Sequence, residues 1–141
     1  MIIRQLSVFL ENKSGRLAEV TEILGNSGIN ISAFSIADTA EYGILRMIVS
    51  KPDEAFNKLK EAGFAVHTTE VVCLIVPHEP GGLSRALGIL SEAGISIEYM
   101  YAFAIDNGAW VIIRTDSISQ TIEVLQKHKL ELKKASEIYQ L

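Results

Sequence analysis

The chain has 141 residues, of which 48% are hydrophobic and 21% are charged, and its formal net charge is −4. This composition is typical of a compact soluble protein and argues against a disordered chain. The acidic balance provides no basic face for phosphate groups, so neither nucleic acid nor an anionic membrane is an expected partner.

The first half of the chain alternates between strand and helix patterns. Apolar residues alternate in LSVFL at 6–10, which predicts a strand, and they recur every three or four residues over 17–24, which predicts a helix. Gly28 is placed to cap the end of this helix. Two extended segments follow, INISAFSIA and ILRMIVS, joined by a turn over 39–43. A second helix begins at Pro52 and ends at Gly63, before the strand FAVHTTE.

The second half repeats this order of elements. It has a strand VVCLIV, a helix over 83–92, the strands ISIEYMYAFAI and AWVIIRT around a turn at 106–108, a helix over 119–127 and a last strand LELKKASEIYQL. A shift of 66 residues places Gly15 on Gly81 and Leu17 on Leu83, and the register then holds without a gap. A repeat of this length indicates a duplicated small domain, because solenoid repeats are shorter and need three or more copies. We therefore predict two domains, 1–68 and 69–141.

The order of elements predicts the fold of each half. Strand, helix, strand, strand, helix, strand indicates an α+β fold of two ferredoxin-like βαββαβ units, each an antiparallel sheet with its helices on one face. We predict that the units join side by side into one sheet of eight strands. The central strands carry apolar residues on both faces, such as Ile48 beside Val49 and Ile112 beside Val111. Because such strands are normally buried on both sides, we predict that a second copy of the chain covers the back of the sheet in a homodimer.

Sequence motifs for catalysis, metal binding and export are absent. The chain has no C-x-x-C pair, no H-E-x-x-H, no phosphate-binding G-x-x-x-x-G-K-[ST] and no G-x-G-x-x-G. Its three histidines are too scattered for a shared metal site, and the single cysteine, Cys73, lies in an apolar run that indicates a buried structural thiol. The opening residues lack the apolar core of a signal peptide. We expect a cytoplasmic protein without enzyme activity, metal or cofactor.

Both halves keep a glycine in the bend between the first strand and the first helix, in NKSGRL and HEPGGL. A glycine at this position lets the backbone approach a ligand closely, and the free amides at a helix N-terminus attract a carboxylate. An ordinary turn between a strand and a helix explains the same pattern, since Pro-Gly turns are common. The local sequence leaves both interpretations open.

The stretches ENKSGRLAEVTEILGNSGINI and HEPGGLSRALGILSEAGISI together resemble the ACT domain, a small amino-acid-sensing module attached to many biosynthetic enzymes. The resemblance covers the whole chain as two tandem copies. It implies a non-catalytic regulatory protein that binds an amino acid or a similar small molecule where two ACT units meet. In serine-sensing members of the family, polar loop side chains and an asparagine at the start of the second strand hold the ligand. Asn12 and Asn30 match these positions, but Leu10 replaces a loop histidine, so serine is not assumed.

The resemblance implies two ligand sites, each joining the loop of one unit to the second strand of the other. One site joins Asn12, Gly15, Arg16 and Leu17 to Ser96 and Ile97, and the other joins His78, Gly81, Gly82 and Leu83 to Asn30 and Ile31. Since the chain carries no catalytic domain, it is expected to act on a separate metabolic enzyme or as a free-standing sensor. The alternative is an assembly module in which ligand binding has been lost.

Overall fold

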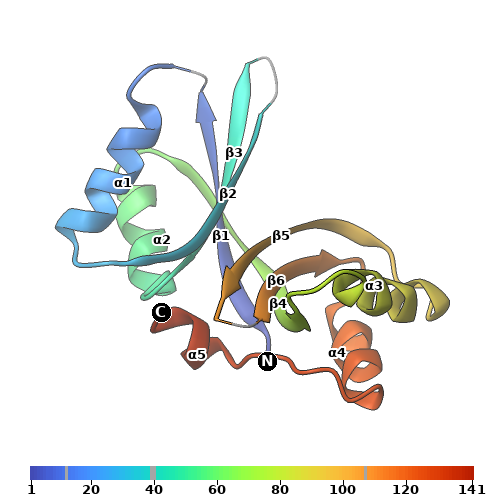
Figure 1. The fold of residues 1–141 in the computed structure, drawn as a ribbon. Helices are drawn as coiled ribbons and strands as arrows, with labels where there is room; N and C mark the ends of the chain where they lie inside the picture. Colours follow the sequence, from blue (N-terminus) through green and yellow to red (C-terminus); the bar gives the residue numbers. More distant parts are fainter. Residues whose placement is uncertain (12, 39–40, 107) are drawn as a thin grey trace. The chain divides into compact units, whose positions relative to one another are not determined.

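The structure is a computed structural model that describes residues 1–11, 13–38, 41–106 and 108–141. Its elements (Figure 1) are β1 (Ile3–Glu11), α1 (Arg16–Asn26), β2 (Ile31–Asp38), β3 (Tyr42–Val49), α2 (Pro52–Glu61), β4 (Ala65–Pro77), α3 (Gly82–Glu92), β5 (Ile97–Ile105), β6 (Gly108–Thr115), α4 (Ile118–Lys127) and α5 (Ala135–Tyr139). The chain divides into two compact units. The α1 unit comprises Arg4–Thr69 with Ser136–Leu141, and the α3 unit comprises Glu70–Ala135 with Met1–Ile3.

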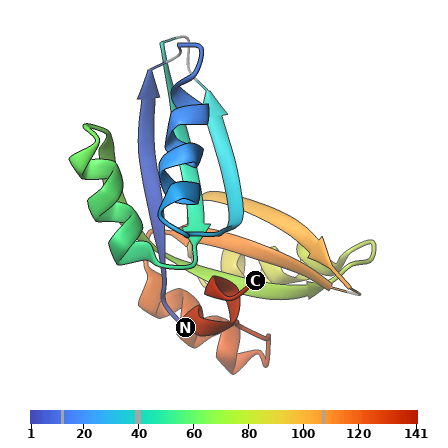
Figure 2. The ribbon, with the colours of Figure 1, turned by 90° about the vertical axis from the view of Figure 1, so that its left-hand side faces the viewer.

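In the α1 unit, α1 and α2 cover one face of antiparallel strands (Figure 2). β1 pairs with β3, which places Leu6 opposite Met47, and β2 pairs with the other side of β3. Alternate strand residues therefore face the helices, as the period of two requires. Together they form a core with buried residues of both helices: Leu6, Val8, Leu10, Leu45, Met47, Val49, Val20, Leu24, Ala55 and Leu59.

The α3 unit repeats this arrangement. β6 pairs antiparallel with both β4 and β5, so that Leu74 lies opposite Val111. Its core combines β4 and β6 with α3 and α4: Val72, Leu74, Val76, Val111, Ile113, Ala86, Leu90, Ile118 and Leu125. Each half thus has its own hydrophobic core, and the predicted α+β fold with antiparallel strands is confirmed.

The backbone repeats along with the sequence. Gly15 and Gly81 precede α1 and α3 with φ values of 91° and 86°, in the left-handed region that favours glycine. Gly28 and Gly94, which follow the same helices, have φ values of 69° and 72°. Gly15 and Gly81 therefore share one left-handed conformation, which explains why both halves keep a glycine at this position.

The strand count differs from the predicted eight. The described residues form one sheet of 6 strands in the order β2-β3-β1-β4-β6-β5. The predicted strands FAVHTTE and VVCLIV form one continuous strand of 13 residues, β4, because no glycine or proline interrupts them. The predicted last strand is also wrong, since it is reduced to a bridge between Leu74 and Leu132 and is followed by the helix α5.

The back faces of the central strands are buried within a single chain. Ile48 and Ile112, whose apolar character motivated a covering second copy, are both 0% exposed. Cys73 is also buried, as predicted. Burial at these two positions does not by itself indicate a second copy.

The last residues of the chain pack into the α1 unit. Ile138 is fully buried, and the Tyr139 hydroxyl oxygen accepts a hydrogen bond of 2.8 Å from the main-chain N–H of Arg4. The side-chain amide of Asn30 donates a hydrogen bond of 2.9 Å to the carbonyl oxygen of Leu141.

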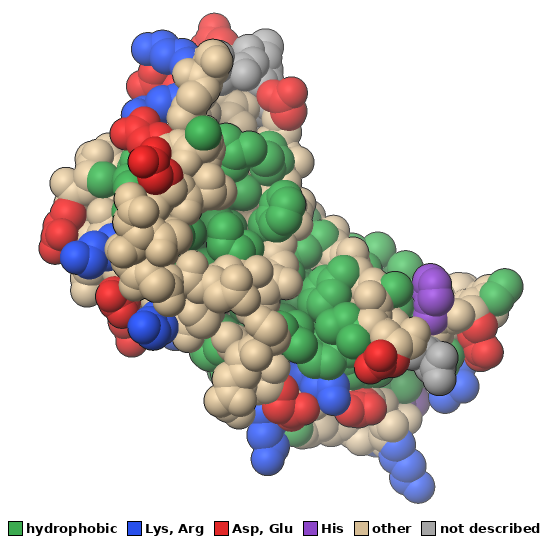
Figure 3. All heavy atoms as spheres, turned by 60° about the vertical axis from the view of Figure 1, so that its left-hand side comes forward, with side chains coloured by type: hydrophobic (Ala, Val, Ile, Leu, Met, Phe, Trp, Pro, Cys, Tyr) green, Lys and Arg blue, Asp and Glu red, His purple; other side chains and the backbone are tan. Residues whose placement is uncertain are grey.

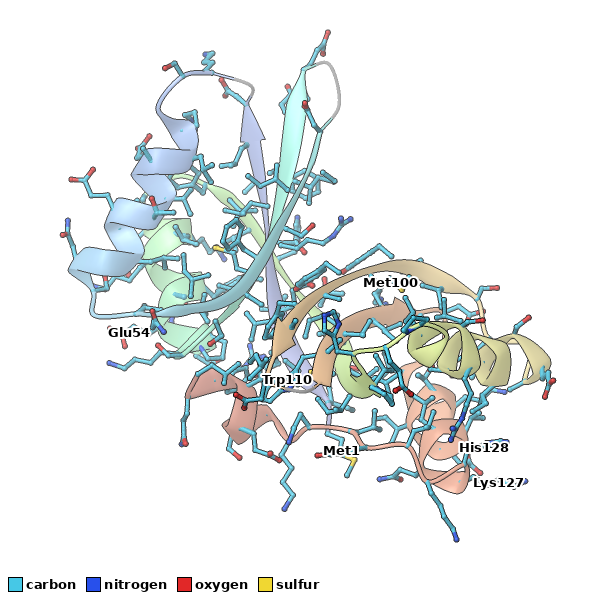
Figure 4. The ribbon with its side chains drawn as sticks, viewed as in Figure 1. Met1, Glu54, Met100, Trp110, Lys127 and His128 are labelled. Atoms are coloured by element: carbon cyan, nitrogen blue, oxygen red, sulfur yellow. The ribbon has the colours of Figure 1, made fainter. Side chains whose placement is uncertain are left out.

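The first residues belong to the α3 unit, where the Gln126 amide donates to the sulfur of Met1 at 2.9 Å (Figure 4 labels Met1). The α1 unit is thus completed by Ser136–Leu141, which follow the α3 unit in the sequence. The α3 unit is completed by Met1–Ile3, which precede the α1 unit.

No helix within the described ranges has the length and apolar character needed to cross a membrane.

Candidate functional site

Each unit has a pocket beside the bend that leads into its first helix. The α1 pocket has a volume of about 210 Å³ and is lined by Leu10, Glu11, Lys13, Arg16, Leu17, Ile36, Asp38 and Gly43. The α3 pocket has a volume of about 310 Å³ and is lined by Val76, Pro77, His78, Glu79, Leu83, Ala102, Phe103, Ala104, Ala109 and Val111. In both pockets the lining comes from the end of one strand, the bend, the first helical turn and the following hairpin.

The two pockets occupy equivalent positions in the repeat. At the shift of 66 residues, Leu10 corresponds to Val76, Glu11 to Pro77, Lys13 to Glu79, Leu17 to Leu83, Ile36 to Ala102, Asp38 to Ala104 and Gly43 to Ala109. Both members of every pair line their own pocket. The pocket is therefore a property of the repeated fold, whereas its chemistry differs between the copies.

The α1 pocket is small and carries charges of both signs. Glu11 forms an ion pair of 2.8 Å with Lys13, and the hydrogen bond to this ammonium group, together with its charge, lowers the pKa of the Glu11 carboxyl. The Arg16 guanidinium donates to Glu19 at 3.1 Å and lies 4.6 Å above the Phe64 ring. Within the described part of the chain the buried Nε of Arg16 has no hydrogen-bond partner. A ligand with polar groups at both ends suits this lining.

The α3 pocket is larger and mostly apolar. Three charged residues of the α1 pocket are replaced by uncharged ones, since Glu11, Arg16 and Asp38 correspond to Pro77, Gly82 and Ala104. His78 and Glu79 are its polar members. This lining suits a ligand with an apolar side chain.

The family model of the ACT domain pair matches residues 1–141. The chain belongs to this family. The resemblance noted in the sequence is thereby confirmed over the whole chain. ACT domains are regulatory modules and are typically non-catalytic.

Solved structures share the fold of this chain over most of its length. The ACT pair is 52% identical to protein BT0572 from Bacteroides thetaiotaomicron, with a TM-score of 0.97 over 100% of this chain and 98% of that chain. It shares its fold with the regulatory subunit of aspartate kinase from Thermus thermophilus at 17% identity and a TM-score of 0.64, over 88% of this chain and 91% of that chain. The corresponding subunit from Thermus flavus has 14% identity and a TM-score of 0.63, with 90% and 94% covered. A search of curated proteins gives no match.

The structure of the ACT pair brings only some of the predicted loop residues to the pockets. Arg16 and Leu17 line the α1 pocket, and His78 and Leu83 line the α3 pocket. Gly15 precedes α1 as its cap, while Gly81 and Gly82 line a different and larger pocket of the α3 unit. Asn12 lies outside the described residues.

The predicted residues at the start of each second strand lie in equivalent places, but neither pocket includes them. The main-chain N–H of Asn30 donates a hydrogen bond of 2.9 Å to the hydroxyl oxygen of Ser50. The side-chain amide of Asn30 donates to the carbonyl oxygen of Leu141. Ser96 has the equivalent contact, because its main-chain N–H donates to Asp116 at 3.2 Å. Ile31 and Ile97 pack against the cores of their own units. The crosswise combination of loop and strand stays a prediction.

The hairpin side of each pocket was missed by the sequence reasoning. Ile36, Asp38 and Gly43 line the α1 pocket, and Ala102, Ala104 and Ala109 are their counterparts. Alternation along INISAFSIA and the 66-residue shift could have identified Ile36 and Ala102 as one equivalent pair. Neither pattern gives the hairpin register that places Gly43 opposite Asp38. Within the described ranges no group of three or more His, Cys, Asp or Glu side chains could hold a metal ion.

Proposed function

We propose that this ACT pair is a regulatory protein that binds an amino acid, or a similar small molecule, in the α1 and α3 pockets. The observation that carries the proposal is the presence of a pocket at the same repeat position in both units, beside a glycine-containing bend. α1 and α3 both begin without a side-chain cap among the described residues. The N–H groups of Arg16 and Gly82 donate to the carbonyl oxygens of Lys13 and Glu79, so the amides that follow them in the first turn are proposed to hold a ligand carboxylate.

Because their linings differ, the two pockets are expected to prefer different amino acids. The α1 pocket, with its ion pair and Arg16, suits a small polar amino acid. The α3 pocket suits a larger apolar one, because the equivalents of Glu11 and Asp38 are Pro77 and Ala104. The two affinities for any one amino acid therefore differ.

The regulated partner is a separate metabolic enzyme. Two proteins of similar fold are regulatory subunits of aspartate kinase, which supports a role as a separate regulatory subunit. The alternative is an assembly module without a ligand, and the α3 pocket argues against it, because its apolar lining surrounds open space instead of being filled by side chains.

The ACT pair is proposed to act as a homodimer joined through edge strands. β2 and β5 are the first and last strands of the sheet, so each has one side without a neighbouring strand. Both present exposed apolar side chains: Phe34 is 64% exposed, Ile36 46% and Met100 39%. Figure 3 shows hydrophobic side chains at the surface, and Figure 4 places Met100 on β5. An exposed apolar edge favours pairing with another chain. Because Ile36 also lines the α1 pocket, a partner strand would help to enclose the ligand.

The dimer predicts a mass of two chains by light scattering at micromolar concentration. Phe34→Glu is expected to yield a monomer, since it places a charge on the edge strand without disturbing the core. Ala18→Glu, which adds the same charge at an exposed position of α1, should leave the mass unchanged. A parent protein with the mass of one chain would refute the dimer.

Ligand binding predicts a thermal shift with a few of the twenty amino acids. At a hundredfold excess over the dissociation constant, a ligand stabilises the folded state by about 2.7 kcal/mol. For a chain of this size we expect a rise in Tm of about 5–10 °C, measured by dye fluorescence.

A pair of variants tests the location of the α3 ligand. Ala104→Leu adds bulk inside the α3 pocket at an exposed position, so it should abolish the shift caused by an apolar amino acid. Ala18→Leu makes the same change outside both pockets and should keep the shift. If no amino acid moves the melting curve, the assembly module becomes the better account. A shift that survives Ala104→Leu would keep the function and reject the pocket.

A further inference from the structure

A third pocket, the Gly82 pocket, lies within the α3 unit and is larger than the other two. Its volume is about 590 Å³, and it is lined by Ile75, Val76, Pro77, Glu79, Pro80, Gly81, Gly82, Arg85, Ala86, Gly108, Lys129, Leu130 and Glu131. It shares Val76, Pro77 and Glu79 with the α3 pocket. Its remaining lining comes from α3 and from 129–131, whereas the α3 pocket is bounded by β5.

The equivalent space in the α1 unit is filled by an arginine. Gly82 corresponds to Arg16 and Leu130 to Phe64 at the 66-residue shift. In the α1 unit the Arg16 guanidinium lies 4.6 Å above the Phe64 ring, and its Nε is buried. In the α3 unit both side chains are smaller, and a pocket bounded by Gly82 and Leu130 takes their place.

The local backbone prevents a side chain at position 82 from filling the pocket. A Cβ atom on Gly82 would overlap the carbonyl oxygen of Pro77. The same oxygen accepts a hydrogen bond of 2.9 Å from the N–H of Glu79, which fixes the tight bend. The open space is therefore built into the bend.

The charges around the space are reversed relative to the other unit. The carboxylate that pairs with Arg16 is Glu19, and the residue equivalent to Glu19 is Arg85. The pocket is lined by two cations, Arg85 and Lys129, and by two carboxylates, Glu79 and Glu131. Among the described residues Arg85, Lys129 and Glu79 form no ion pair, while Glu131 pairs with Lys133 at 2.9 Å. In the α3 unit two cations without an ion pair, Arg85 and Lys129, thus outnumber the one such carboxylate, Glu79. An anion is the complementary ligand.

We propose that the Gly82 pocket binds a small carboxylate with an apolar body. Arg85 receives the carboxylate, with Lys129 as a second cation, and the apolar body packs against Leu130 and Ala86. An arginine suits this role because its guanidinium can donate two parallel hydrogen bonds to a carboxylate. The site adjoins the α3 pocket but differs from it in Arg85, Lys129 and Leu130, and it does not depend on the proposed function.

The test compares two probes of the same shape, 4-methylvalerate and its uncharged amide, 4-methylvaleramide. Titration of the ¹⁵N-labelled protein is followed by NMR at the amides of Gly82, Arg85 and Leu130. We expect the carboxylate to bind with a dissociation constant of about 1 mM, within the range open to so small a ligand. The amide is expected to bind about tenfold more weakly, because it forfeits a charge-assisted hydrogen bond.

Two variants distinguish binding in the Gly82 pocket from a general attraction of the carboxylate probe to positive charge on the protein. Arg85→Gln keeps much of the side-chain length and should weaken the carboxylate about tenfold while leaving the amide unchanged. Lys127→Gln removes an exposed cation at the end of α4 (Figure 4), outside the pocket, and should change neither constant. Equal binding of the two probes, an unaffected Arg85→Gln, or perturbations confined to His78, Ala102 and Ala104 of the α3 pocket would each overturn the proposal.

Discussion

Truncation of either equivalent core leucine, Leu24→Ala or Leu90→Ala, is expected to lower the free energy of unfolding by about 3–5 kcal/mol. Both side chains are 0% exposed, and each lies in the core of its own unit. Each variant should still unfold in a single transition, because β4 contributes Val66 to one core and Val72 to the other without interruption. Unfolding of one unit would leave that unit's half of β4 without its neighbouring strands.

The measurement is urea unfolding followed by far-UV circular dichroism, with Leu17→Ala as the control. Leu17 is 41% exposed, so its truncation should cost less than about 1 kcal/mol. Two separate transitions in Leu24→Ala or Leu90→Ala would show that the units unfold independently and would contradict the role given to β4.

Gly82→Ala is expected to destabilise the protein by about 3 kcal/mol, although it adds a single methyl group. The added Cβ would overlap the main-chain oxygen of Pro77, and a backbone atom cannot move aside as the end of a side chain can. The bend before α3 must then open, which disturbs the packing of Ala86 in the core.

Gly88→Ala is the matched control on the same helix. A Cβ at Gly88 meets nothing within 4 Å, and the residue lies inside α3 at an exposed position. Since alanine is the better helix former, this variant should gain about 0.5–1 kcal/mol. A Gly82→Ala variant as stable as the parent, measured by the same urea unfolding, would show that the bend is not as tight as described.

Most elements could be predicted because their apolar periods are clear. The alternation in LSVFL and the helical spacing before Leu24 recur in the second half, so two independent segments support each assignment. The end of the chain has no such support. LELKKASEIYQL begins with alternating leucines, but only Leu132 bridges to β4, and the segment from Ala135 becomes helical with Ile138 buried. The burial of Ile138 in a helix thus outweighed the weak strand pattern of this segment.

The candidate site was predicted only where it depends on local sequence. The glycine bends and the first helical turns gave Arg16, Leu17, His78 and Leu83, which line the two pockets. The contributions of Asp38 and Ala104 depend on hairpin register, which the chain's periodicity does not specify. The contact between Asn30 and Leu141 joins residues far apart in sequence, and no pattern indicated it.

The exchange of chain ends has a consequence for biosynthesis. The α1 unit receives Ile138, Tyr139 and Leu141 from a segment that is translated after Glu70–Ala135 of the α3 unit. Although its strands leave the ribosome first, this unit cannot reach its final stability before Ser136–Leu141 have been translated. The α3 unit instead has Met1–Ile3 available from the start. Of the two copies, the one encoded second therefore completes its set of residues first, and the nascent amino-terminal copy is the one exposed longest to chaperones and proteases.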